Sequence, residues 1–150
     1  MSLSQRRPAP RRSSVRDPVA ERLQKARELG ATGTEVHGLV DVVITAKPVK
    51  SVAEQALALL KTFGRLCLFA GLPKDGSVLH LDGNPIHYKN LTVTGTTGGC
   101  AVDYRTALNL IASRRVDVRP VISHVFPVTK VAEAYDVALS GKCLKVVMTC

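Results

Sequence analysis

The sequence predicts an α/β fold organised around a doubly wound parallel sheet, and three features support this prediction. Strand-length apolar runs alternate with segments of helical periodicity from Asp41 to Cys150. The apolar runs are continuous, which is typical of parallel strands buried on both faces. Capping residues and glycines fall between them, where helices would start and stop. A chain of 150 residues with 45% hydrophobic residues suits one globular domain.

The first expected helix begins at Asp17. Aspartate favours the N-cap, and Pro18 then occupies the first helical position, where a missing N–H costs nothing. Gly30 is expected to end this helix in the left-handed conformation. Residues 31–38, rich in glycine and threonine, are predicted to form a loop.

The next elements form a strand–helix–strand unit. Residues 39–46 form an apolar strand that Pro48 closes. The spacing of Ser51 and Glu54 fits a capping box that opens a helix reaching Leu60, with Gly64 following its end. The later elements are predicted in this order: strands at 65–70, 78–81 and 91–94, a helix capped by Asp103, an extended segment at 116–126, a helix capped by Thr129, and a strand at 144–148.

Charge divides the chain into a tail and a domain. Residues 1–16 contain five arginines and no acid, and so supply five of the nine net positive charges. Their proline and serine content predicts a disordered basic tail ahead of a domain at 17–150. A nucleic-acid or membrane-surface arm and a targeting peptide are the functional alternatives. The tail lacks interleaved aromatic residues and an amphipathic period, which favours a plain solvated extension.

Composition argues against several classes of protein. No apolar run approaches the ~20 residues of a membrane span, and no apolar N-terminal run indicates secretion. The absence of tryptophan disfavours base-stacking platforms. Neither the four cysteines nor the four histidines have metal-ligand spacing, and a disulfide framework is not expected. These observations predict a cytoplasmic protein without a membrane partner, and they disfavour a nucleic-acid partner.

Motifs for phosphate binding are weak. No G-x-G-x-x-G occurs in the sequence. Gly95 to Gly99 follow a strand and precede a helix, where backbone N–H groups could meet an anion. The same residues also suit a simple tight turn. His87 has no carboxylate partner in the sequence that would indicate proton-transfer chemistry.

Several segments together resemble the zinc-dependent medium-chain alcohol and polyol dehydrogenases, of the sorbitol and threonine dehydrogenase type. They are DVVIT at 41–45, EQALALL at 54–60, GRL at 64–66, FAGLP at 69–73, IHYKNLTVTG at 86–95, YRTAL at 104–108 and LSGKCLKVV at 139–147. The resemblance is continuous over 41–150 and also includes 17–31.

This resemblance implies an NAD site. It matches Asp17 to the acid that binds the adenosine ribose and Arg22 to the basic residue beside the adenine. Ala70, Gly71 and Leu72 correspond to the turn that passes the nicotinamide. The loop that reaches the carboxamide side of the nicotinamide corresponds to Thr96 and Thr97.

The sequence also departs from the family pattern. It has no catalytic domain with Cys, His and Glu zinc ligands, no first strand and no glycine turn for the pyrophosphate. Lys47 stands where the family usually has a glycine, and 121–149 resembles the segment that returns to the catalytic domain. The expected fold is therefore a partial Rossmann-like sheet.

Three functions follow from these features. The first is a truncated NAD-dependent, zinc-type dehydrogenase that is inactive alone, with NAD bound weakly or not at all and zinc held only in the full-length family. The second is a non-catalytic association module whose sheet edges pair with another copy or with a full-length relative. The third is a nucleic-acid binder that acts through the arginine tail.

Overall fold

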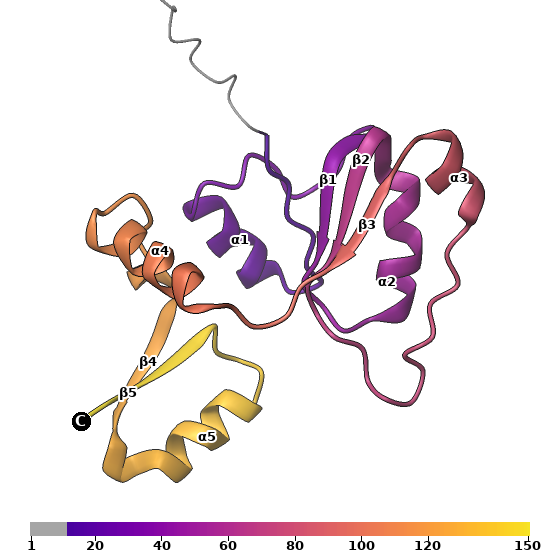
Figure 1. Ribbon diagram of the computed structural model, residues 1–150. Helices are drawn as coiled ribbons and strands as arrows, with labels where there is room; N and C mark the ends of the chain where they lie inside the picture. The colour runs from indigo at the N-terminus through magenta and orange to yellow at the C-terminus, as the bar shows by residue number, and fades with distance from the viewer. Residues whose placement is uncertain (1–11) are drawn as a thin grey trace, which may run out of the picture. The chain divides into compact units, whose positions relative to one another are not determined.

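The computed structural model describes residues 12–150, which fall into two compact units that meet at Gly98 and Gly99. The first unit contains α1 (Ala20–Glu28), β1 (Val40–Thr45), α2 (Lys50–Gln55), the 3₁₀ helix η1 (Ala56–Leu59), β2 (Leu60–Leu68), α3 (Gly83–Tyr88) and β3 (Thr92–Gly95) (Figure 1). The second contains α4 (Ala101–Ala112), η2 (Arg119–Val121), β4 (Ile122–Pro127), η3 (Val128–Lys130), α5 (Val131–Leu139) and β5 (Lys145–Thr149).

The first unit is a three-stranded parallel sheet in the order β1-β2-β3. Its register places Ile44 beside Cys67, and Cys67 beside Thr94. η1 contacts β1, β2 and α3, and the core forms where these elements meet. Leu60 and Leu66 are fully buried there, and each contributes about 1.5–3 kcal/mol of transfer free energy. The core cluster consists of Ala56, Leu57, Leu60, Leu66 and Leu91.

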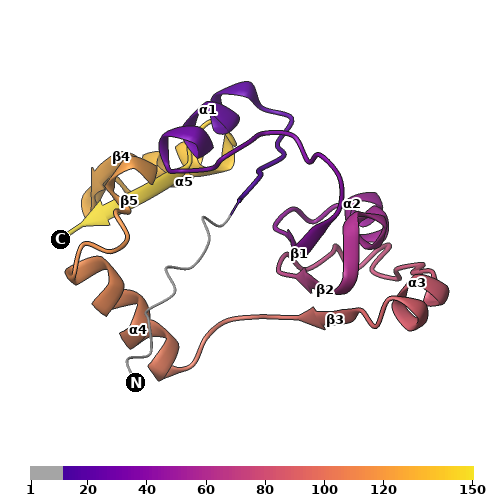
Figure 2. The same ribbon diagram turned by 90° about the horizontal axis from the view of Figure 1, so that it is seen from above.

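The second unit contains a smaller sheet. β4 and β5 form a parallel pair, and α5 packs against both strands (Figure 2). Ala134 of α5 is the one buried residue in the range 99–150. This unit therefore has little apolar burial of its own.

The predicted α/β class with parallel strands is confirmed. Three predicted strands agree with β1, β3 and β5 to within one or two residues. The extended segment at 116–126 becomes a strand only from Ile122, because η2 occupies the residues around Pro120. β4 and β5 form a parallel pair, so the described strands belong to a three-stranded sheet in the first unit and a two-stranded sheet in the second.

The predicted helix caps were wrong in detail. α1 begins at Ala20 because the Asp17 carboxylate accepts the N–H of Val19 at 2.8 Å and holds a turn before the helix. α4 begins after Cys100, and Asp103 reaches back from the third helical position to accept the Cys100 N–H at 2.8 Å. α5 begins after Lys130, because η3 occupies the residues around Thr129.

The expected capping box and the strand at 78–81 were also wrong, for one shared reason. The Glu54 carboxylate accepts the N–H of His80 at 2.8 Å and lies 3.7 Å from the Lys50 ammonium. Ser51 and Glu54 therefore do not form a capping box. Residues 78–81 are held by the hydrogen bond between the His80 N–H and the Glu54 side chain, and they form no strand.

One helix was missed. α3 follows Asp82, whose carboxylate accepts the N–H of Asn84 at 2.9 Å. Aspartate before Gly83 and Asn84, with Pro85 in the first turn, is a recognisable helix start. The missed helix is only six residues long and lacks an apolar period, which is the signal that the sequence analysis relied upon.

Gly64 lies inside β2 instead of after a helix. The β1–β2 register shifts between Val40 and Val42, and Phe63 beside Gly64 has a φ of 63°. A Cβ at Gly64 would lie 2.8 Å from the carbonyl oxygen of Lys61. Glycine is therefore required here by close backbone approach.

The expected tail of residues 1–16 falls mainly on residues 1–11, which lie outside the described residues. Ser14 forms an isolated parallel bridge with Gly33, and the N–H of Val15 donates to the Gly33 carbonyl at 3.0 Å. These contacts attach residues 13–15 to the segment that follows α1.

Candidate cofactor pocket

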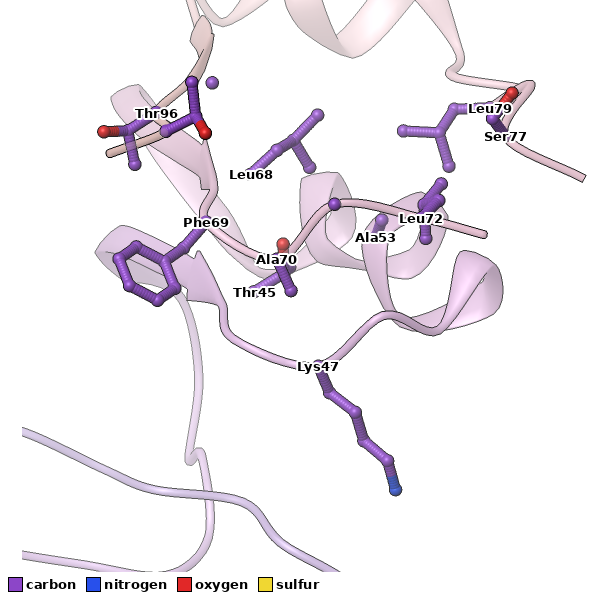
Figure 3. Close-up of a pocket in the computed structure, with 13 residues that line it drawn as sticks. Thr45, Lys47, Ala53, Leu68, Phe69, Ala70, Leu72, Ser77, Leu79 and Thr96 are labelled. Carbon is purple, nitrogen blue, oxygen red and sulfur yellow. The ribbon is translucent and has the colours of Figure 1, made fainter. Parts of the chain in front are cut away.

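A pocket of about 490 Å³ opens at the carboxyl ends of the three parallel strands of the first unit (Figure 3). This position is where open α/β sheets bind ligands, and the volume lies within the usual range for small-molecule sites. The lining residues are Thr45, Lys47, Ala53, Leu68, Phe69, Ala70, Gly71, Leu72, Ser77, Leu79, Gly95, Thr96 and Thr97.

Backbone hydrogen bonds fix the loops that form the pocket. The N–H groups of Phe69 and Ala70 donate to the carbonyl of Thr45 at 3.2 and 3.0 Å. The N–H of Thr96 donates to the carbonyl of Leu68 at 3.2 Å. The segments after β2 and β3 are thus each anchored to the last carbonyl of the neighbouring strand.

The pocket wall is apolar, with polar groups at its edges. Ala53 of α2 is only 3% exposed, and Leu68, Leu72 and Leu79 present aliphatic side chains (Figure 3). Serine and threonine hydroxyls are contributed by residues 45, 77, 96 and 97. Lys47 is the one charged residue among the described residues that line the pocket.

Five of the seven residues predicted to bind the cofactor meet in this pocket. They are Ala70, Gly71, Leu72, Thr96 and Thr97. The other two, Asp17 and Arg22, do not line it. Their side chains lie 3.9 Å apart as an ion pair between Asp17, which precedes α1, and Arg22 in the first turn of α1.

Thr45, Ala53 and Leu79 are among the lining residues that were not predicted from the sequence. Thr45 ends β1, so the rule that ligands bind at carboxyl strand ends could have found it. Ala53 lines the pocket from α2, and Leu79 lies beside His80, whose N–H donates to the Glu54 carboxylate of the same helix. No local pattern signals that tertiary contact.

No histidine, cysteine, aspartate or glutamate lines the pocket within the described residues. No group of three such residues that could hold a metal ion occurs anywhere in residues 12–150. The residues present therefore do not fit a zinc site.

The resolved pKa shifts lie on exposed surfaces outside the pocket. Hydrogen bonds from the Arg119 side chain lower the pKa of Asp117 to about 2. The N–H of Cys100 lowers the pKa of Asp103, and the Lys25 ammonium lowers that of Glu28. These shifts come from local helix and turn contacts and do not indicate acid–base catalysis.

A parallel α/β sheet with a pocket at its strand ends defines a nucleotide-binding type of fold. The profile of the zinc-binding dehydrogenases matches residues 14–113. The chain therefore belongs to the zinc-binding dehydrogenase family of oxidoreductases, and the resemblance found in the sequence is confirmed.

The chain is similar to L-threonine 3-dehydrogenase of Bacillus subtilis, at 30% identity over an alignment of 143 positions that covers 85% of this chain and 41% of the relative. It is also similar to sorbitol dehydrogenase of Gallus gallus, at 26% identity over an alignment of 153 positions that covers 91% of this chain and 42% of the relative.

Among solved structures, it resembles a protein described as a short chain alcohol dehydrogenase of E. coli CFT073, solved with the cofactor NADH. The TM-score is 0.80 at 20% identity, and the match covers 93% of this chain and 45% of the other. This likeness establishes the partial Rossmann-like fold.

The chain thus spans about two-fifths of the length of the curated relatives it matches. None of the helices in residues 12–150 is long and apolar enough to cross a membrane.

Proposed function

We propose that this chain is the cofactor-binding part of an NAD-dependent, zinc-type dehydrogenase that acts on alcohols or polyols. The observation that carries the proposal is that residues 70–72 and 96–97, which correspond to the nicotinamide contacts of the family, line one pocket. These segments follow different strands, so their meeting depends on the fold.

The pocket fits the nicotinamide end of NAD. Apolar side chains could pack on the ring, and the hydroxyls of Thr96 and Thr97 could bond its carboxamide. The N–H groups of Gly71 and Leu72 donate no hydrogen bond to another described residue, so they remain available to a ligand. When bound, the nicotinamide supplies the hydride acceptor of alcohol oxidation.

The pyrophosphate end has no comparable site. Dinucleotide affinity in this fold depends on a glycine turn at a helix N-terminus, and the sequence contains no G-x-G-x-x-G. Two or three net hydrogen bonds at about 1 kcal/mol each do not offset the several kcal/mol lost on association. We therefore expect the 150-residue chain alone to bind NAD at millimolar strength or weaker and to leave alcohols unreacted.

Backbone amide NMR during an NAD titration tests this proposal. We expect millimolar binding with shifts concentrated at residues 70–72 and 96–97. Gly71→Val should abolish these shifts without unfolding the chain, because a Cβ at Gly71 has no atom within 4 Å. Gly83→Val, at a similarly open glycine outside the pocket, is the matched control.

A titration without shifts at the pocket would refute the proposed site. A micromolar dissociation constant would refute the proposed weak binding, and it would point to a phosphate site at Gly95 to Gly99.

A second candidate function is association with another copy of the chain. β1 is an edge strand among the described strands. Val43 packs on the core, so its neighbours Val42 and Ile44 project from the opposite face of the sheet, where they are 52% and 62% exposed. An apolar edge strand of this kind favours strand addition by a partner.

Light scattering across a concentration series tests the second candidate. The chain should form oligomers, and Ile44→Lys should shift it toward the monomer. Val102→Lys, at a 69% exposed position of α4, is the matched control and should leave association unchanged. A stable monomer at high concentration would exclude this function.

A further inference from the structure

The charge of the pocket has a consequence for the redox state of its ligand. Lys47 lies two residues beyond the end of β1 and is exposed. The other lining residues that the structure describes are uncharged, so no carboxylate offsets its charge within the lining. A ligand in this pocket therefore meets the positive charge of Lys47 as the one formal charge of the lining, beside a mainly apolar wall.

The two redox states of a nicotinamide differ by one charge at the ring. The oxidised ring is a cation and the dihydronicotinamide ring is neutral, while the phosphate and ribose are the same in both. A positive field destabilises the bound cation and leaves the neutral ring unaffected. The apolar wall adds to this difference, because burying a cation without a counter-charge is unfavourable.

We propose that Lys47 makes this pocket selective for the reduced nicotinamide over the oxidised one. The inference builds on the proposed function, since it assigns a redox preference to the same site. Lys47 acts from the rim: its side chain extends away from the other labelled lining side chains in Figure 3. Charges that interact across several ångströms near solvent change affinity modestly, so the lysine should contribute a factor of about 2–5 at low salt.

The experiment compares nicotinamide mononucleotide in its oxidised and reduced forms, because both carry the same phosphate. Amide shifts at residues 70–72 and 96–97 of the full chain report the dissociation constant of each form in about 0.05 M salt, where the Debye length exceeds 10 Å. The reduced form should bind several-fold more tightly. Lys47→Gln should lower the ratio of the two affinities by about 2–5-fold, and raising the salt to about 0.5 M should lower it similarly in the wild type.

Lys61→Gln is the matched control. Lys61 lies at the amino end of β2, away from the strand ends that form the pocket, and its ammonium is 3.3 Å from the Asp41 carboxylate. This substitution removes the same charge from the same sheet, and the affinity ratio should stay at its wild-type value.

Several outcomes would overturn the inference. If Lys47→Gln weakens both forms equally, the lysine acts on the phosphate and not on the ring. If both forms bind and the ratio is unchanged in Lys47→Gln, or if it falls equally in Lys61→Gln, Lys47 has no specific role, although the site itself stands. If neither form shifts the pocket residues, the proposed function fails together with the inference.

Discussion

The two units of this chain bury their side chains very differently. In the first unit, η1, β2 and the residue before β3 contribute five buried side chains to a continuous core, and Leu60 and Leu66 are fully inaccessible. In the second, α5 covers a two-stranded sheet and buries only Ala134, while Val125 and Met148 on its strands remain 61% and 46% exposed. A two-stranded sheet with one helix cannot enclose a core of this kind. The pocket lies in the unit with the larger buried core, and the second unit should open first.

The largest expected effect comes from removing a core side chain of the first unit. Leu66→Ala should destabilise that unit by about 2–5 kcal/mol, because it leaves a cavity in a closed core. Leu139→Ala in α5, at an 80% exposed position, should change stability by less than about 0.5 kcal/mol. Hydrogen exchange resolved by residue should show faster exchange in β1–β3 for the first variant only. Equal effects of the two variants would contradict the conclusion that the first unit has the larger buried core. If Leu66→Ala fails to fold, the milder Leu66→Val tests the same conclusion.

A smaller loss of stability is expected from a substitution at Gly64, inside β2 of the first sheet. Gly64→Ala would place a Cβ 2.8 Å from the Lys61 carbonyl oxygen and 2.9 Å from the Leu60 Cβ. Because both neighbours belong to β2 itself, relief requires a backbone shift that costs about 1–3 kcal/mol. Gly83→Ala, where a Cβ meets no atom within 4 Å, is the control and should be neutral or slightly stabilising. Urea unfolding followed by far-ultraviolet circular dichroism measures both, and a neutral Gly64→Ala would refute the close-approach argument.

A still smaller loss of stability is expected when the buried Ala134 of the second unit is replaced. Ala134→Gly and the exposed Ala138→Gly each lose about 1 kcal/mol of helix propensity in α5. Ala134→Gly additionally loses a buried methyl group, so it should cost about 0.5–1 kcal/mol more than Ala138→Gly. Hydrogen exchange of α5 amides measures the difference. If the two variants are equally stable, α5 does not bury Ala134 in solution.

The smallest effect concerns the pH response of the second unit. Asp117 accepts the Arg119 guanidinium at 2.7 and 2.8 Å, which lowers the pKa of Asp117 to about 2 from its ordinary value of 3.8. A lowered pKa stabilises the folded unit above about pH 4, and this contribution is lost as the pH falls toward 2. Both groups are exposed, so the effect on stability should be slight. Carboxyl NMR should give a midpoint near 2, and Arg119→Gln should raise it toward 3.8. An unchanged midpoint in the variant would show that Arg119 is not the cause.

The sequence alone determined the class of fold, and five of the residues that it proposed for the nicotinamide end line the pocket. Continuous apolar runs predict parallel strands, and β1, β3 and β5 are found close to the predicted positions. The expected burial on both faces is not found, since Val42 and Ile44 of β1 are exposed. The segment at 69–73 follows β2, and Thr96 and Thr97 follow β3, so both reach the pocket at the ends of adjacent strands. The apolar runs are local properties of the sequence, and the meeting of the two loops is a consequence of strand order.

Tertiary contacts decided the rest. The parallel pairing of β4 with β5 joins segments about twenty residues apart in sequence, which no local pattern encodes. Glu54 suits a capping box by spacing, yet its carboxylate bonds His80, because in the folded chain that N–H lies within reach and has no ladder partner. The same contact brings Leu79 to the pocket beside Ala53. Side-chain hydrogen bonds between segments compete with local caps at similar energies, so only the assembled fold determines which of them forms.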